Sequence, residues 1–270
     1  MDPIAPFNNI RPGLQYIDRE EIRLSGIRRV IVTGDIGCTG FYEDSKKILA
    51  QILKHETDLF FFLGDLAFTG SDEEFHEIID FCNRRIKVPI FALCGNHDLP
   101  GYEKFLGSSS YALLLDTFVC VFLSNATGYF SDRDITFFET TLNRYTEKNF
   151  ILFMHAPPPT DIDRSHLLPE EWEKIKKVLD RHREKVRHIF CAHIHGFHDY
   201  RLDGYPVTIS AGGGAAMINE LKIPEQKIHH AVAVNLHADG TLSTEVILCS
   251  AGEKGCSWSA DPLPKGECSG

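Results

Sequence analysis

Long hydrophobic runs and an excess of basic residues are both missing from this 270-residue sequence. Its apolar runs are short, as at residues 59–63, and none approaches the roughly 18 apolar residues that a membrane helix needs. Lysine and arginine number 28 against 38 aspartates and glutamates, which gives a formal charge of −10. The sequence therefore predicts neither a membrane-spanning protein nor one that binds nucleic acid through a basic surface.

A secretory signal is also missing, because no basic region followed by an apolar stretch occurs at the N-terminus. We therefore expect a cytoplasmic protein. Five of the eight cysteines lie within or beside apolar segments, where a free thiol behaves as a small hydrophobic side chain. These predicted structural thiols are Cys38, Cys82, Cys94, Cys120 and Cys191.

Buried-strand patterns alternate with helical patterns in the first half of the chain. The strand-like segments are residues 27–33, 58–63, 88–94, 117–123, 149–154 and 186–191. Apolar residues at helical spacing occur over 43–54 and 71–84, and Ser71 with Glu74 fits a capping box. This alternation predicts βαβ units and a parallel sheet.

The second half favours antiparallel hairpins. Strand-like segments at 205–210, 229–236 and 242–248 are separated by short turns, and helical segments at 134–145 and 169–184 precede them. The end of the chain is rich in glycine, serine and proline, so it can bury little surface. We predict one domain over residues 1–249, followed by a flexible tail over 250–270.

Aspartate, asparagine and histidine recur in the turns that directly follow these strands. The residues are Asp35, Asp65, Asn96, His97, Asp98, His155, His193 and His195. Each alone could be an ordinary turn residue, because Gly-Asp and Gly-Asn turns are common. The carboxyl ends of parallel strands, however, form the ligand crevice of an α/β sheet, so these side chains should converge. Their shared position favours a functional site.

The types of side chain indicate binding of divalent metals. Carboxylate, carboxamide and imidazole groups together suit Mn, Fe, Zn or Co better than Ca. His193 and His195 are two residues apart, so in an extended chain both rings point the same way. There are more donors than one ion takes, and a pair of ions about 3.5–4 Å apart, bridged by one carboxylate, accounts for the surplus.

These motifs, in order Gly-Asp, Gly-Asp, Gly-Asn-His-Asp, a separate His and Ala-His-Ile-His, resemble the calcineurin-like metallophosphoesterase superfamily. The likeness is to the branch of cyclic-nucleotide phosphodiesterases and related single-domain enzymes, and it covers about residues 28–248. It implies an α/β fold, a four-layer α/β/β/α sandwich of two mixed sheets flanked by helices. It also implies hydrolysis of a small phosphodiester or phosphomonoester through a dinuclear metal-activated hydroxide.

The resemblance also implies a role for each residue. The metal ligands would be Asp35, Asp65, Asn96, His155, His193 and His195. Asp65 would bridge the two ions, one of which would also bind Asn96, His155 and His193 while the other would bind Asp35 and His195. His97 would donate a proton to the leaving oxygen or stabilise the transferred phosphoryl group, and Asp98 could orient His97 through a hydrogen bond.

One position departs from the family pattern. Gly37 stands where the family has the histidine of Asp-x-His, which leaves one site with three protein ligands. Three ligands and a water still make a catalytic site, but metal affinity should fall. Cys38 or His198 could fill the gap, although a side chain adjacent to a ligand position usually points elsewhere.

The missing imidazole also motivates a second hypothesis, a degenerate scaffold of the same fold that binds a protein partner with weak or no catalysis. Retention of every other ligand and of His97 favours the enzyme. A nuclease is disfavoured by the charge of −10, so the expected partner is a small phosphate ester.

Overall fold

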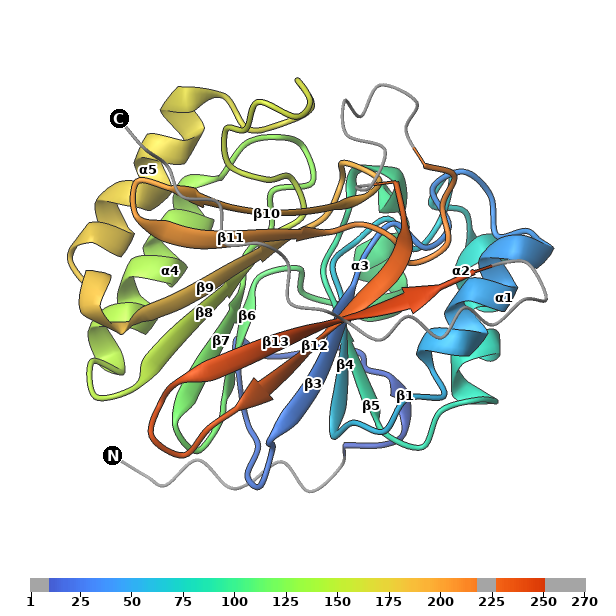
Figure 1. Ribbon diagram of the computed structural model, residues 1–270, viewed down its shortest axis with the longest axis horizontal. Helices are drawn as coiled ribbons and strands as arrows, with labels where there is room; N and C mark the ends of the chain where they lie inside the picture. Colours follow the sequence, from blue (N-terminus) through green and yellow to red (C-terminus); the bar gives the residue numbers. More distant parts are fainter. Residues whose placement is uncertain (1–9, 218–226, 251–270) are drawn as a thin grey trace.

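Two β-sheets form the centre of the fold, and helices flank them on both sides (Figure 1). The computed structural model describes residues 10–217 and 227–250. The six-stranded sheet has the order β1-β5-β4-β3-β12-β13, and the seven-stranded sheet has the order β10-β11-β9-β8-β7-β6-β2. This is the α/β architecture of two mixed sheets flanked by helices that the resemblance implies.

The first sheet is parallel over four neighbouring strands and antiparallel at one edge. Its strands are β1 (Gly13–Leu14), β3 (Arg29–Thr33), β4 (Leu59–Phe62), β5 (Pro89–Ala92), β12 (His229–Leu236) and β13 (Leu242–Cys249). Strand β4 pairs in parallel with both β3 and β5, whereas β12 pairs antiparallel with β3 and β13. The carboxyl ends of β3, β4 and β5 therefore lie at one edge of the sheet.

The second sheet has a parallel centre of β7, β8, β9 and β11. Its strands are β2 (Glu21–Arg23), β6 (Tyr111–Leu114), β7 (Phe118–Phe122), β8 (Asn149–Phe153), β9 (Val186–Cys191), β10 (Phe197–Leu202) and β11 (Tyr205–Ser210). The expected antiparallel hairpin is that of β12 and β13 in the first sheet. Strand β11 pairs antiparallel with β10, which was not predicted, and in parallel with β9.

In the part of the chain that the structure describes, five α-helices flank the sheets. They are α1 (Glu43–Ile52), α2 (Asp72–Asn83) and α3 (Tyr102–Leu106) beside the first sheet, and α4 (Asp132–Arg144) and α5 (Pro169–Asp180) beside the second (Figure 1). The predicted capping box of Ser71 and Glu74 begins α2. Helix α4 begins two residues earlier than predicted because Ser131 and Asp134 form a second capping box. Helix α5 ends earlier than predicted, and the chain continues into a 3₁₀ turn at Arg183–Lys185.

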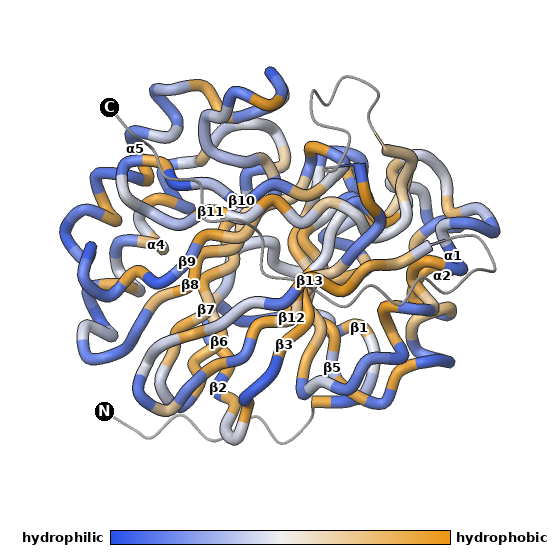
Figure 2. Tube along the Cα trace, viewed as in Figure 1, coloured by the Kyte–Doolittle hydropathy of each residue, from blue (hydrophilic) through white to orange (hydrophobic). Residues whose placement is uncertain are grey.

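Side chains of the central strands are buried on both faces of the first sheet. In β4, Leu59 and Phe61 belong to the core between the sheets, whereas Phe60 and Phe62 pack in the core under α1 and α2. The ring of Phe61 lies 5.0 Å from that of Phe122 in the second sheet, measured between centroids. Figure 2 shows that hydrophobic residues concentrate along the central strands and that hydrophilic residues are frequent in the helices and the peripheral turns.

Within the described residues, no helix is long and apolar enough to cross a membrane. Cys82, Cys120 and Cys191 are buried free thiols, as predicted. The predicted tail lies outside the described residues apart from Ser250.

Candidate metal centre

The six predicted ligand positions lie together where strands of both sheets end. Asp35 follows β3, Asp65 follows β4, Asn96 follows β5, His155 follows β8, and His193 and His195 follow β9. The donor atoms form two clusters that share Asp65. We name Asp35, Cys38, Asp65 and His195 the first cluster, and Asp65, Asn96, His155 and His193 the second cluster.

The backbone is strained at three of these positions. Asp35, Asp65 and His193 have φ angles of 56°, 57° and 70°, in the left-handed region that side chains other than glycine rarely adopt. Such a conformation costs about 1–2 kcal/mol for each residue and is found mostly at functional sites. The strained backbone at these residues therefore lowers the stability of the fold, and it directs their side chains toward the site.

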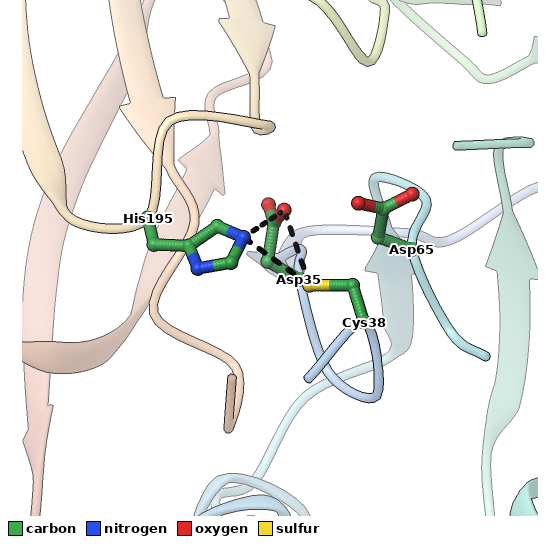
Figure 3. Close-up of side chains that lie close together, drawn as sticks. All are labelled: Asp35, Cys38, Asp65 and His195. Carbon is green, nitrogen blue, oxygen red and sulfur yellow. Dashed lines mark hydrogen bonds and ion pairs between the residues drawn. The ribbon is translucent and has the colours of Figure 1, made fainter. Parts of the chain in front are cut away.

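The first cluster gathers a carboxylate, a thiol and an imidazole around one point (Figure 3). His195 Nε2 lies 3.3 Å from Asp35 Oδ1 and 3.2 Å from Cys38 Sγ. Cys38 Sγ lies 3.8 Å from the same carboxylate oxygen. The donor atoms of all four residues, Asp65 included, lie within 4.8 Å of one another.

Hydrogen bonds to the backbone orient the first cluster. His195 Nδ1 donates to the Ala216 carbonyl at 2.6 Å, and the Ala216 amide donates to Thr39 Oγ1 at 2.9 Å. Because Nδ1 carries the proton, a neutral His195 presents the lone pair of Nε2 to the cluster. The second oxygen of Asp35 accepts from the His193 amide at 2.8 Å, so Oδ1 remains for the cluster.

The buried carboxylates of the first cluster favour a positive charge at this place. Burial opposes ionisation of Asp35, but the hydrogen bond and charge of His195 lower the pKa of Asp35 to about 2. Burial disfavours charged His195 as well, yet Asp35 raises the pKa of His195 to about 9. Burial and the charge of Asp35 raise the pKa of Asp65 to about 7. Two buried carboxylates beside one imidazole are a donor set that fits a divalent cation.

The second cluster centres on His155. Its Nε2 lies 3.0 Å from Asn96 Oδ1, 3.2 Å from His193 Nδ1 and 3.5 Å from Asp65 Oδ1. His155 Nδ1 donates to the Leu63 carbonyl at 2.7 Å, which leaves Nε2 as the unprotonated ring nitrogen. Burial is the largest cause that lowers the pKa of His193, to about 4. Neutral imidazoles of this kind are the form that binds metals.

Asn125 supports the second cluster and was not predicted as a site residue. Its Oδ1 accepts from the amides of His155 and Ala156 at 2.9 and 3.1 Å, and its Nδ2 donates to the Ala156 carbonyl at 2.8 Å. The side chain is 1% exposed. One signal in the sequence could have found it, because Asn125 follows β7 just as the ligands follow their strands.

His97 lies beside Asp65 at the surface of the site. Its amide donates to Asp65 Oδ1 at 2.9 Å, and its Nδ1 donates to the Phe68 carbonyl at 2.8 Å. The imidazole stacks on the ring of Phe68 with centroids 5.8 Å apart. This contact with Phe68, rather than one with Asp98, orients the ring.

The expectation that Asp98 orients His97 through a hydrogen bond is therefore wrong. The carboxylate of Asp98 is fully buried and accepts from four backbone amides. They belong to Asp65, Leu66, Ala67 and Gly95, at distances of 2.8–2.9 Å. Asp98 thereby ties the loop after β4 to the loop after β5, and it positions Asp65 rather than His97.

Packing explains why position 37 is a glycine rather than a histidine. A Cβ built on it would lie 2.0 Å from the Leu66 carbonyl oxygen, so no side chain fits in this loop conformation. Cys38, predicted to be a structural thiol, points into the first cluster (Figure 3). His198, the other candidate, lies in β10, stacked on Tyr200, and belongs to neither cluster.

Known proteins resemble this chain in sequence and in fold. A family model described as calcineurin-like phosphoesterase matches residues 28–197. A probable glycerophosphodiester phosphodiesterase GpdQ from Arcobacter nitrofigilis is 25% identical over an alignment of 162 residues, and the match covers 53% of this chain and 58% of that protein. The chain thus spans less than two thirds of this curated relative.

Two solved structures share the fold. Purple acid phosphatase PPD1 from yellow lupin (Lupinus luteus) has a TM-score of 0.67 at 15% identity, over 83% of this chain and 52% of the lupin chain. GAP50, the anchor in the inner membrane complex of Plasmodium, has a TM-score of 0.65 at 10% identity, over 86% of this chain and 87% of its own. At these identities the likeness concerns the fold alone.

Proposed function

Because this chain belongs to the calcineurin-like phosphoesterase family, we propose that it hydrolyses a small phosphate ester with the help of two divalent cations. The observation that carries the proposal is that one carboxylate, Asp65, belongs to both donor clusters. A carboxylate shared by two cation positions is typical of sites that catalyse in-line displacement at phosphorus.

The residues divide into two cation positions. Asp35, Asp65 and His195 would hold one cation, and Asp65, Asn96, His155 and His193 would hold the other. When bound, such cations polarise phosphoryl oxygens and lower the pKa of water. The strained loops and the buried hydrogen bonds of Asn125 and Asp98 hold these donors in place before substrate arrives, which reduces the reorganisation that catalysis requires.

His97 is the proton donor in this proposal. Its Nδ1 donates to the Phe68 carbonyl, so Nδ1 keeps its hydrogen in either protonation state, and in the imidazolium form Nε2 carries the proton that can be transferred. Since the His97 amide is bonded to Asp65, the ring is held next to both cation positions. A proton from Nε2 would neutralise the leaving alkoxide.

A phosphodiester is the favoured substrate class. The curated relative from Arcobacter is named a probable glycerophosphodiester phosphodiesterase, and it matches over 53% of this chain. A phosphomonoester remains the second class, which the experiment below separates from the first.

A scaffold with weak or no catalysis is the alternative function. GAP50, described as an anchor, shares the fold, so the fold itself is compatible with either role. Three strained ligand positions and a His97 ring fixed at the site favour the enzyme, because a docking surface gains nothing from them.

The test is hydrolysis of bis-p-nitrophenyl phosphate and p-nitrophenyl phosphate by metal-stripped protein reloaded with Mn, Fe, Co, Zn or Mg. Metal stoichiometry is measured on the same samples. We expect turnover with near two ions per chain and a higher rate on the diester. No turnover with any metal, together with one bound ion or none, would refute the enzyme and support the scaffold.

His97→Asn tests the proton donor. We expect turnover to fall about 10²–10⁴-fold, the range for loss of a general acid, with metal stoichiometry unchanged. His237→Asn, at an exposed histidine beside Ser243, is the matched control and should leave both unchanged. Full activity in His97→Asn would remove the assigned role.

A further inference from the structure

We propose that Cys38 is a ligand of the first cation position, and that its thiolate makes this position select a thiophilic cation such as zinc or cobalt over magnesium or manganese. The proposal rests on the proposed function, because it concerns the same centre. It adds a donor and a metal class that the family motifs do not supply here, since Gly37 occupies the position of the histidine.

The spacing of the donor atoms supports a common ligand sphere. Metal–sulfur bonds of about 2.3 Å and metal–nitrogen or metal–oxygen bonds of about 2.0–2.2 Å in a tetrahedral site place donors roughly 3.4–3.6 Å apart. The three separations among His195 Nε2, Asp35 Oδ1 and Cys38 Sγ are 3.2, 3.3 and 3.8 Å. Each separation lies within about 0.2 Å of this range, so the triangle is close to the size that one tetrahedral cation requires.

The loop after β3 holds the thiol in this orientation. The amides of Ile36 and Gly37 both donate to the Asp65 carbonyl at 3.0 Å, and the Gly40 amide closes a turn on the Gly37 carbonyl at 2.7 Å. Because Gly37 packs directly against the Leu66 carbonyl, the turn brings the next side chain inward. Cys38 is 1% exposed, so its sulfur is shielded from solvent in this loop.

The surroundings of Cys38 differ from those of a structural thiol. Cys82, Cys120 and Cys191 belong to the hydrophobic cores of the molecule. Cys38 belongs to neither core and faces the carboxylate of Asp35 and the imidazole of His195 instead (Figure 3). A buried sulfur among ionisable donors gains little from apolar packing, whereas a cation would bind all three donors.

The donor types then distinguish the two cation positions. A thiolate with imidazole and carboxylate ligands suits zinc, iron or cobalt, whereas the amide oxygen of Asn96 makes the second cluster a harder donor set. On binding, the S–H bond of Cys38 breaks, its electron pair forms the bond to the cation, and the proton leaves to solvent. The two positions should therefore bind different metals from a mixture.

Cobalt absorption tests the ligand directly. The full chain with Cys256→Ser and Cys268→Ser, which removes the thiols outside the described residues, is stripped of metal and titrated with Co²⁺. We expect a thiolate-to-cobalt charge-transfer band in the near ultraviolet that saturates at one equivalent. Cys38→Ser should abolish the band, and Cys249→Ser, at a half-buried cysteine of β13, should retain it.

Metal choice gives a second readout. Replacement of ligand-supporting groups alone costs about 10–100-fold in metal affinity, so Cys38→Ser should weaken zinc binding at the first position by at least tenfold. Cys38→Asp should bind manganese as well as the parent does, because a carboxylate is a hard ligand, and should still lack the cobalt band. Circular dichroism of the metal-free variants checks that they fold.

The outcomes separate this proposal from the proposed function. Two bound cobalt ions and diester hydrolysis without a charge-transfer band in the parent would overturn the Cys38 ligand and leave the enzyme standing. A band that persists in Cys38→Ser would overturn it as well. If the parent binds no cobalt at all, both proposals fail.

Discussion

The two clusters share Asp65 but differ in how their other donors are supported. In the second cluster His155 is fixed twice, through its ring by the Leu63 carbonyl after β4 and through its backbone by Asn125 after β7. In the first cluster the ring of His195 depends on the Ala216 carbonyl, whose own amide depends on the exposed Thr39. The second cluster is anchored in both sheets, and the first is anchored through loops.

This difference suggests a separate role for each of the two clusters. A donor set tied to two packed sheets should keep its geometry whichever cation binds, so in the proposed enzyme the second cluster would set where the phosphate ester binds. A donor set held by loops, and containing sulfur as we propose, would set which cation binds. A substitution of the shared residue Asp65 should therefore impair both clusters. A substitution of a residue that hydrogen-bonds to the ligands of one cluster should impair that cluster alone.

The largest effect is expected from Asp65→Asn, which removes the shared carboxylate. Turnover should fall by about 10³-fold or more, since both cation positions lose a charged ligand. Burial and Asp35 raise the pKa of Asp65 to about 7, so its ionised form costs stability that grows with pH up to about that value. The metal-free variant should consequently unfold at a higher temperature than the parent at pH 8.

Asp44→Asn, at an exposed carboxylate of α1, is the control for Asp65→Asn and should change neither quantity. Differential scanning calorimetry of metal-free protein and diester hydrolysis of reloaded protein measure the two effects. A metal-free Asp65→Asn protein less stable than the parent would contradict the electrostatic account of the site.

Asn125→Ala is expected to break the second cluster alone. The amides of His155 and Ala156 would lose their acceptor in a fully buried place, which costs about 1–3 kcal/mol for each. Affinity for the second cation should fall about 10–100-fold, while the cobalt band of the first position remains. Urea unfolding and metal titration measure this, with Ser124→Ala as the neighbouring control. Equal losses at both positions would show that the clusters are not independently supported.

Local patterns predicted most of the fold and of the site. Strand β9 and strand β12, which forms a hairpin with β13, have the predicted bounds. The six predicted ligand positions lie together in the structure. Strands β1 and β2, of two and three residues, are too short for any periodicity to reveal. Strand β10 was missed because it mixes polar and apolar residues and is buried fully at none of its positions.

The parts of the site that could not be predicted depend on contacts distant in sequence. Asp98 bonds amides about thirty residues earlier in the chain, and no local rule distinguishes these from the nearby His97. The direction of Cys38 follows from the packing of Gly37 against the Leu66 carbonyl, a contact between two separate loops. A motif fixes which residues are present, but loop packing decides where their side chains point.

Part of the stability that the protein loses in acid should come from a residue outside both clusters. Measuring this part separates it from the contribution of the clusters. Burial lowers the pKa of His188 in β9 to about 4 from an unfolded value near 6.5. The unfolded chain therefore binds a proton first as the pH falls, and about 3 kcal/mol of stability should be lost between pH 6.5 and 4. His188→Gln, which keeps a partner for Thr208, should flatten this slope in urea unfolding of metal-free protein. An unchanged slope would assign the acid loss to the other buried histidines, His193 and His230, whose pKa values burial also lowers to about 4.

The smallest effect is expected from Thr39→Val, which acts on the first cluster only. Valine has the shape of threonine but lacks the oxygen that accepts from the Ala216 amide, so the support of the His195 ring is weakened. At an exposed position this should cost about 1 kcal/mol or less in the free energy of unfolding. Affinity for cobalt at the first position should fall a few-fold, the second position should be unaffected, and Thr39→Ser should behave as the parent. A fall at the second position instead would reverse the assignment of which cluster is held by loops.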